Sequence, residues 1–264
     1  MADRQTMFTG AAEVYDRFVG RYSPALAAAM CDAARVQPGQ RAVDVGCGSG
    51  ALVAELAARL GAENVAGVDP SEPFVAASRA RVPGARVVVG SAESLPFADN
   101  EFDATLSQLV VNFLSDPQLG LREMARVTRG DGVVAGCVWD YGGEMTMLRT
   151  FWDAATALDP DGAAPLVEAH TMRFSTPDEL ETLWRTALED VQVSAIVVEA
   201  SYDGFDDLWA PFPTGVGPAG AYTASLDDVA QAALRDEYAR RLGRADGPFR
   251  LSARAWCAVG RAPG

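Results

Sequence analysis

A short glycine-rich string holds the residues best suited to bind a small molecule. Its three glycines alternate along the chain: Gly46, Gly48 and Gly50. Glycines at alternate positions leave the backbone without Cβ atoms where a ligand must come close. A predicted buried strand over 43–45 precedes the string, and a second apolar stretch, 65–68, ends at Asp69. A carboxylate in that position can accept hydrogen bonds from both hydroxyls of a ribose.

The same residues also fit the loose dinucleotide fingerprint G-x-G-x-x-G/A, through Gly46, Gly48 and Ala51. Asp44 distinguishes between a dinucleotide and a ligand without a phosphate group. It lies just before the first glycine, where its negative charge would repel a pyrophosphate. S-adenosylmethionine (SAM) has no phosphate and carries a sulfonium and an ammonium group, which the same carboxylate would attract. Two alternatives stay open: a nucleotide-dependent oxidoreductase with a Rossmann site, and a SAM-binding protein without catalysis.

The string D-x-G-x-G-x-G that starts at Asp44, followed by G-V-D-P-S over 67–71, resembles two motifs of a known family. They are motif I and the acidic loop of class I SAM-dependent methyltransferases, in the type 11 branch that includes the quinone-biosynthesis enzymes. The resemblance covers roughly residues 15–139. It implies an enzyme that uses SAM as its cofactor. The cofactor-binding residues that it implies in these two motifs are Asp44, Gly46, Cys47, Gly48, Asp69 and Pro70.

Three further segments supply the remaining cofactor candidates. The string G-S-A-E-S-L-P-F over 90–97 resembles the adenine-binding turn of the family, with Ser91 in place of the common aspartate. In the family, an aromatic and a basic residue of the leading segment contact the methionine end of SAM, and the end of the fourth strand lies beside the glycine loop. The residues that the resemblance implies here are Tyr15, Arg21, Ser91, Ala92, Glu93 and Gln108.

The elements that position these residues follow from the hydrophobic pattern. Short apolar strands alternate with helical stretches from Val43 onward, which predicts a parallel sheet with helices on both faces. Helices are expected before the first strand, over 11–19 and 25–35. The string 129–132 is expected to be a turn, and 208–220 a loop too rich in proline and glycine for regular structure.

The resemblance implies an α/β fold with a Rossmann-like, doubly wound, seven-stranded sheet. The sheet is mostly parallel, and its last strand, over 250–259, is antiparallel. An N-terminal helical cap and lid insertions after strands 5 and 6 complete this fold. We expect a single methyltransferase domain over 1–264, composed of a cap (1–35), a SAM-binding half (36–140) and an acceptor and lid half (141–264).

Three residues are candidates for the chemistry of the acceptor. Asn112 follows the fourth strand, where many relatives have histidines, and can hydrogen-bond an acceptor. Tyr141, with Glu144 as a rival, follows the fifth strand. His170 is the only histidine and could take the acceptor proton, although it could equally be a surface or structural residue. Methyl transfer is a direct displacement, so a shaped pocket can supply much of the acceleration without a base.

The expected acceptor pocket is walled by residues that follow the fourth and fifth strands and by the two lid segments: Asn112, Trp139, Tyr141, the helix from Glu144 and the loop 209–220. Aromatic side chains in these segments favour a bulky, weakly polar small molecule. The sequence contains no N-P-P-Y or D-P-P-Y string after the fourth strand, which would resemble methyltransferases that act on amines of nucleic acid bases.

Composition restricts the other partners. The chain has 264 residues and a formal net charge of −14, and all 22 basic residues are arginines. Nucleic acid binding draws on clustered basic residues, so we expect no nucleic acid partner. Four scattered cysteines, the absence of a metal-ligand pattern and the absence of an apolar run of ~18 residues predict no metal site and no membrane span. We expect a cytoplasmic monomer or homodimer.

Overall fold

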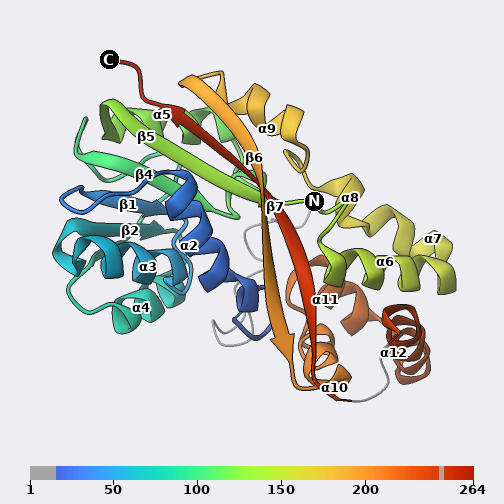
Figure 1. Ribbon diagram of the computed structural model, residues 1–264. Coiled ribbons are helices and arrows are strands. Elements are labelled where there is room, and N and C mark those ends of the chain that lie inside the picture. Colours follow the sequence, from blue (N-terminus) through green and yellow to red (C-terminus); the bar gives the residue numbers. More distant parts are fainter. Residues whose placement is uncertain (1–15, 244–246) are drawn as a thin grey trace. The chain divides into compact units, whose positions relative to one another are not determined.

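A computed structural model gives the structure of the chain and describes residues 16–243 and 247–264 (Figure 1). The described chain forms two compact units. We call one the sheet unit; it comprises Ser23–Trp139, Arg173–Ile196 and Ala255–Gly264. We call the other the helical unit; it comprises Asp140–Met172, Val197–Arg254 and the described residues up to Tyr22. That the chain acts as a single domain stays a prediction.

The sheet has seven strands in the order β3-β2-β1-β4-β5-β7-β6. Their bounds are β1 Ala42–Val45, β2 Val65–Asp69, β3 Arg86–Val89, β4 Phe102–Gln108, β5 Thr128–Trp139, β6 Glu189–Tyr202 and β7 Phe249–Arg261. Strands β1 to β5 pair in parallel, and β7 runs antiparallel to β5. The predicted seven-stranded, mostly parallel sheet with an antiparallel last strand is therefore confirmed. Every residue of β1 and β2 is buried, as expected for strands covered on both faces.

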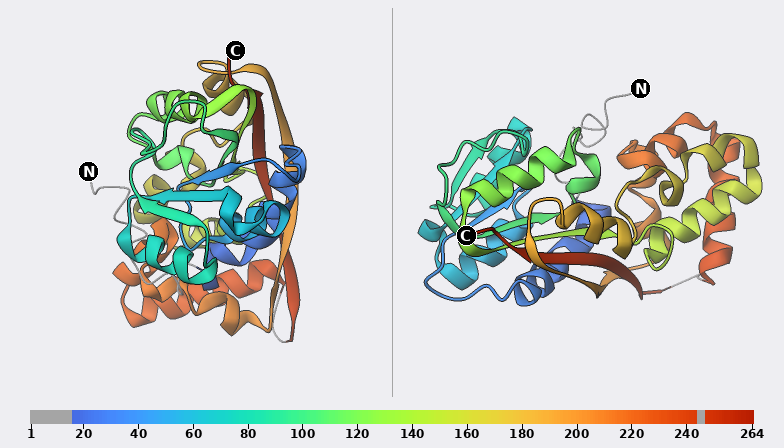
Figure 2. Two further views of the ribbon diagram at one scale, coloured as in Figure 1. Left: turned by 90° about the vertical axis from the view of Figure 1, so that its left-hand side faces the viewer. Right: turned by 90° about the horizontal axis from the view of Figure 1, so that it is seen from above.

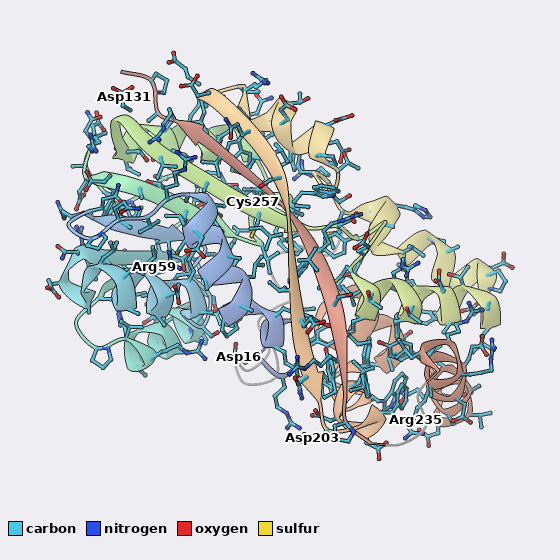
Figure 3. All side chains as sticks on the ribbon, in the orientation of Figure 1. Asp16, Arg59, Asp131, Asp203, Arg235 and Cys257 are labelled. Carbon is cyan, nitrogen blue, oxygen red and sulfur yellow. The ribbon has the colours of Figure 1, made fainter. Side chains whose placement is uncertain are left out.

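Helices cover both faces of the sheet unit. They are α2 Ser23–Ala33, α3 Ala51–Leu60, α4 Glu72–Arg81, α5 Pro117–Val127 and α9 Pro177–Trp184, with 3₁₀ turns η3 Ala62–Asn64 and η4 Val111–Phe113. Helices α2 and α3 lie together on one face, and the view from above shows α5 on the other (Figures 1 and 2). Arg59 of α3 ties these two helices together, since its guanidinium donates to Asp32 Oδ1 (2.6 Å) and to the Ala28 carbonyl (3.1 Å; Figure 3).

The helical unit contains one longer helix pair and several short helices. They are η2 Val19–Tyr22, α6 Thr146–Leu158, α7 Pro160–Ala163, η5 Ala164–Leu166, α8 Glu168–Thr171, α10 Phe205–Trp209, η6 Phe212–Thr214, α11 Gly217–Ser225 and α12 Asp228–Leu242. Aromatic rings fill its interior: Phe151 stacks on Phe212 with ring centroids 4.6 Å apart and meets Tyr238 edge-on at 5.8 Å. Several aromatic side chains of the expected lid segments thus pack on one another.

Three local predictions were wrong. The first helix of the sheet unit begins at Ser23 and ends at Ala33, so it does not run over 25–35. The string 129–132 is part of β5 and forms an irregularity in it, where the register with β4 shifts and Asp131 has φ 60°. The segment 208–220 is largely regular, because α10, η6 and α11 occupy most of it. Of the helix expected over 11–19, residues 11–15 lie outside the described residues, 16–17 are helical, and the 3₁₀ turn η2 begins at Val19.

Candidate cofactor site

The glycine loop connects β1 to α3 and is tied to the end of β2. The N–H groups of Gly46 and Cys47 both donate to the Val68 carbonyl, at 2.8 and 3.0 Å. Gly46 has φ 77°, and a Cβ there would lie 2.4 Å from Val110 Cγ2. Gly48 has φ 49°, and a Cβ there would have no heavy atom of the described residues within 4 Å. The loop is therefore packed against the protein at Gly46 and open at Gly48, where a ligand can approach the backbone.

Asp69 joins the glycine loop to the loop that follows β2. Its Oδ2 accepts a hydrogen bond from Gly48 N–H (3.0 Å), and its Oδ1 accepts one from Ser71 N–H (2.8 Å). Burial raises the pKa of the Asp69 carboxyl, although these two hydrogen bonds lower it in part. Each carboxylate oxygen can accept more than one hydrogen bond, so Asp69 keeps acceptor capacity for a ligand hydroxyl.

Asp44 is the most deeply buried carboxyl group of the loop, with 1% of its surface exposed. Its Oδ1 has no hydrogen-bond partner within the described part of the chain. Burial, and then the nearby charge of Asp69, raise the pKa of Asp44 well above its ordinary value, and a hydrogen bond from the Val53 backbone offsets this only in part. Two buried carboxyl groups in each other's field, on the adjacent strands β1 and β2, create a site that favours a cationic ligand.

The other two candidates from these motifs, Cys47 and Pro70, differ in burial. The Cys47 side chain is 5% exposed, and its Sγ lies 3.2 Å from the position that a Cβ on Gly67 would take, so it packs toward β2. Burial raises the pKa of the Cys47 thiol, which therefore stays protonated. Pro70 is exposed between Asp69 and Ser71. Whether either contacts the cofactor stays a prediction.

The turn over 90–97 is held by its own polar side chains. Ser91 Oγ donates a short hydrogen bond to Glu93 Oε2, and Glu93 N–H donates back to Ser91 Oγ (3.1 Å). Glu93 Oε1 accepts from the N–H groups of Ser115 (3.0 Å) and Asp116 (3.3 Å). Ala92 is buried, as are the predicted packing residues Leu95 and Phe97.

The end of β4 contains a feature that the sequence did not signal. Leu109 has φ 63°, a left-handed conformation that is uncommon for a residue with a side chain, and its N–H donates to the Cys137 carbonyl (2.9 Å). Directly before it, Gln108 Nε2 donates to the Ser23 carbonyl (3.2 Å), and Gln108 Oε1 is buried without a hydrogen-bond partner among the described residues. Asn112 follows in η4 and is 1% exposed.

The remaining candidates that the structure describes belong to the helical unit. Arg21 pairs with the Asp207 carboxylate through two nitrogens, also donates to the Ser201 carbonyl (3.2 Å) and lies 4.9 Å from the Tyr202 ring centroid. Tyr141 is buried directly after β5. His170 is exposed on the short helix α8. Tyr15 lies outside the described residues. The roles of these residues stay predictions.

Sequence reasoning also missed a buried acid in the helical unit. Glu168 of α8 is 4% exposed, and its Oε2 accepts a hydrogen bond from Trp152 Nε1 (2.8 Å). Burial raises the pKa of Glu168 to about 7, and the hydrogen bond from Trp152 opposes that rise only in part. The sequence holds no sign of this site, since a glutamate in a short polar stretch normally faces solvent. Among the described residues, no group of three or more side chains could hold a metal ion, and no helix is long and apolar enough to cross a membrane.

Comparisons with known proteins cover this same region. A family model described as a methyltransferase domain matches residues 43–136, which include the glycine loop, Asp69 and the turn over 90–97. The chain is 39% identical over 152 residues to an uncharacterized methyltransferase of Mycobacterium sp. strain KMS, an alignment that covers 54% of this chain and 60% of that protein. The chain thus spans less than two thirds of that relative's length.

Two further proteins match over more of their length. A demethylmenaquinone methyltransferase of Beutenbergia cavernae is 33% identical over 178 residues, which are 67% of this chain and 71% of that protein. Among solved structures, a SAM-dependent methyltransferase from Thermotoga maritima has a TM-score of 0.55 at 19% identity, and the alignment covers 97% of this chain and 99% of that one. At this identity the structural match concerns the fold alone.

Proposed function

The chain belongs to the family of SAM-dependent methyltransferases, and from this premise we propose that it transfers a methyl group from SAM to a small-molecule acceptor. The observation that carries the proposal is the pair of buried carboxyl groups, Asp44 and Asp69, beside a glycine loop that is open at Gly48. Burial is the largest cause of the raised pKa of each carboxyl group, so a cationic ligand beside them would stabilise their ionised forms.

The residues of the loop suit SAM by charge and by shape. Bound SAM supplies an electrophilic methyl group on a sulfonium. When it is ionised, Asp44 provides a negative charge in a poorly hydrated place, where a cationic group is stabilised more strongly than in water. Asp69 provides acceptors for a ribose, and Gly48 allows the ligand to reach the backbone. A nicotinamide dinucleotide would instead bring a pyrophosphate against these two carboxyl groups.

The acceptor is proposed to be a bulky, weakly polar small molecule. The Beutenbergia cavernae relative is named for methylating demethylmenaquinone, which makes a naphthoquinol the first acceptor to test. Tyr141, Asn112 and His170 stay our candidates for contacting the acceptor or taking its proton. We also propose a cytoplasmic location and a monomer or homodimer, and light scattering after size-exclusion chromatography tests the oligomeric state.

Calorimetric titration with SAM and with NADH tests the cofactor, and an acceptor screen read by mass spectrometry tests the reaction. We expect SAM to bind and NADH not to bind. Asp69→Ala removes charge-assisted hydrogen bonds, each worth roughly 1.5–3 kcal/mol, so SAM affinity should fall about tenfold or more. Asp103→Ala is the matched control: Asp103 also accepts a backbone N–H, from Arg41 (2.7 Å), but lies near the start of β4, away from the carboxyl ends of the parallel strands.

Each result separates the proposal from its alternatives. NADH binding without SAM binding would favour the oxidoreductase. SAM binding without any methylated product across the acceptor screen would favour a SAM-binding protein without catalysis. Unchanged SAM affinity in Asp69→Ala would remove the glycine loop and the end of β2 as the cofactor site.

A further inference from the structure

The turn over 90–97 is fastened along the length of helix α5. At its downstream half, Leu95 N–H donates to Glu123 Oε2 (2.8 Å), and Arg126 Nη2 donates to the Leu95 carbonyl (3.1 Å). In its middle, Ala92 lies against the helix at Gly120, where an added Cβ would be 3.9 Å from Ala92 Cβ. These contacts leave little freedom for the turn to move separately from α5.

At the upstream half of the turn, one side chain makes the connection. The Glu93 carboxylate accepts from Ser91 Oγ with one oxygen and from the N–H groups of Ser115 and Asp116 with the other. The last two residues directly precede α5, where the positive end of the helix dipole favours a carboxylate. Asp116 uses its own carboxylate to accept from Leu119 N–H (2.9 Å), so it does not compete for the same donors. Both oxygens of Glu93 are thus engaged within the protein.

The segment that Glu93 holds also touches the glycine loop. Val110 fills the space beside Gly46, and Leu109, in its left-handed conformation, is fixed to β5 through the Cys137 carbonyl. The segment 109–116 is therefore attached to β5, to the glycine loop and, through Glu93, to the turn, and its Leu114 carbonyl also accepts a hydrogen bond from Arg173 Nη2. Asn112 lies in the middle of it.

We propose that Glu93 is a positioning residue that fixes the turn over 90–97 to the segment 109–116, so that both respond together when SAM binds. This inference rests on the proposed function, and it replaces the expectation that Glu93 contacts the cofactor. The pairing of Ser91 with Glu93 gives a reason for the serine at the position where the family commonly has aspartate. A hydroxyl can donate to the Glu93 carboxylate, whereas a second carboxylate would repel it.

Two substitutions of Glu93 separate positioning from direct contact. In Glu93→Gln the amide oxygen can still accept from Ser115 and Asp116, and the amide nitrogen can donate to Ser91 Oγ, so the geometry is kept and only the charge is lost. Glu93→Ala loses all of these bonds. We expect Glu93→Ala to weaken SAM binding about tenfold and Glu93→Gln to stay within about threefold of wild type. Glu101→Ala is the control, because Glu101 also accepts a backbone N–H, from Ala98 (2.9 Å), but lies directly before β4 begins.

Amide hydrogen exchange measured by NMR supplies a readout that does not need the cofactor. In ligand-free Glu93→Ala, the amides of Ser115 and Asp116 should exchange about tenfold faster or more, while the Leu119 amide, which is bonded to Asp116, should change little. With SAM, exchange should slow over 109–116 in wild type but not in Glu93→Ala.

The inference is overturned if Glu93→Ala binds SAM as wild type does, or if Glu93→Gln loses as much affinity as Glu93→Ala. The second result would show that the charge acts directly on the ligand. Unchanged exchange of Ser115 and Asp116 in ligand-free Glu93→Ala would also overturn it. If wild type is folded and does not bind SAM, the proposed function fails, while the ligand-free exchange experiment still decides whether Glu93 fixes the turn.

Discussion

At the scale of single residues, Asp44 has two opposite effects. Its charge favours the binding of a cation but destabilises the ligand-free protein. A buried carboxyl group with an oxygen that lacks a hydrogen-bond partner destabilises the folded state whenever it is ionised. Since burial and Asp69 raise the pKa of Asp44, the folded protein holds its proton more tightly than the unfolded chain does. Asp44 therefore makes its full contribution to stability at pH values below the ordinary carboxyl pKa of about 4. This contribution is lost as the pH rises through the raised pKa.

Asp44→Asn removes that charge and nearly keeps the shape of the side chain. At pH 8 we expect the free energy of unfolding of the ligand-free protein to rise by about 1 kcal/mol or more, since each unit by which the pKa is raised corresponds to about 1.4 kcal/mol. SAM affinity should fall about tenfold or more at the same pH, because the cation loses its buried partner. Urea denaturation and calorimetry measure the two quantities.

The matched control for that substitution is Asp103→Asn. Burial raises the pKa of the Asp103 carboxyl. Hydrogen bonds from the Arg41 backbone and the Arg129 guanidinium lower it by more, so its pKa is lowered overall. Its removal should therefore destabilise the protein and leave SAM affinity unchanged. A loss of stability in Asp44→Asn of the same size as in Asp103→Asn would contradict the trade-off that we assign to Asp44.

Glu168 makes a second pH-dependent contribution, within the helical unit. Its pKa of about 7 means that stability from this group is full below the ordinary glutamate pKa and is lost as the pH rises toward and through 7. Glu168→Gln keeps an acceptor for Trp152 Nε1 but cannot ionise. We expect wild type to lose on the order of 3 kcal/mol more than Glu168→Gln between pH 5 and pH 8. Urea denaturation at the two pH values tests this, and equal losses in both proteins would rule it out.

The types of residue determined which of these sites could be predicted. Glycines in a string like 44–50 and an aspartate at the end of the next strand have few other uses, so the sequence singles out Gly48 and Asp69 as candidates, and their contact with the cofactor stays a prediction. Leu109 and Glu168 were not. A left-handed leucine and a buried glutamate are each unusual for their residue type, and both depend on what the rest of the chain packs around them.

At the scale of elements, regular alternation of apolar segments predicted the strands and their helices, and proline and glycine caused the errors. The segment 208–220 was expected to be a loop, but Pro218 lies in the first turn of α11, where proline fits a helix well. Gly220 lies inside that helix. A Cβ there would be 3.0 Å from the Gly215 carbonyl carbon, so the packing at this position requires a glycine. The structure of this segment depends on the close packing of α11 against η6. A local sequence pattern gives no information about packing between two elements.

The glycine loop allows a paired test of packing against ligand access. Gly46→Ala places a Cβ 2.4 Å from a methyl group of Val110, so we expect the protein to lose roughly 1–3 kcal/mol of stability from overpacking in addition to the left-handed strain. In Gly48→Ala the added Cβ meets no heavy atom in the described part of the chain within 4 Å, so this variant should lose only the roughly 1–2 kcal/mol of that strain.

The order of Gly46→Ala and Gly48→Ala in SAM affinity should differ from their order in stability. Because we propose that the cofactor reaches the backbone at the open side of Gly48, Gly48→Ala should weaken SAM binding by more than its loss of stability accounts for. Thermal denaturation without ligand, followed by calorimetry on the folded variants, gives both rankings. If Gly48→Ala binds SAM as wild type does, the cofactor does not approach the loop at this residue.

At the scale of the whole molecule, the resemblance implied the number of strands and the antiparallel direction of the last one, but not the division into two compact units. Strands β6 and β7 each belong to both units, since the boundaries fall at Ile196 and Arg254 within them. Sequence periodicity predicts each strand as one continuous segment. It does not predict where a compact unit ends. Contacts between residues distant in sequence set that boundary.

The charge of the whole chain bears on the choice of cofactor. With 36 acidic and 22 basic residues, the protein has a net charge of −14, and its field attracts cations and repels anions. This long-range preference acts in the same direction as the buried Asp44 and Asp69. SAM carries a net positive charge near neutral pH, whereas NADH carries the negative charges of its pyrophosphate, so both effects favour SAM.

Thermal stability measured with each ligand tests the combined effect. A ligand present at 100 times its Kd stabilises a folded protein by about 2.7 kcal/mol. For a chain of about this size each kcal/mol raises Tm by roughly 2–4 °C, so saturating SAM should raise Tm by about 5–10 °C. NADH at the same concentration should leave Tm unchanged, and Asp69→Ala should show a much smaller shift with SAM, because the cofactor has lost its carboxylate partner. An equal shift with NADH would mean that the carboxyl groups at the loop do not select against a pyrophosphate.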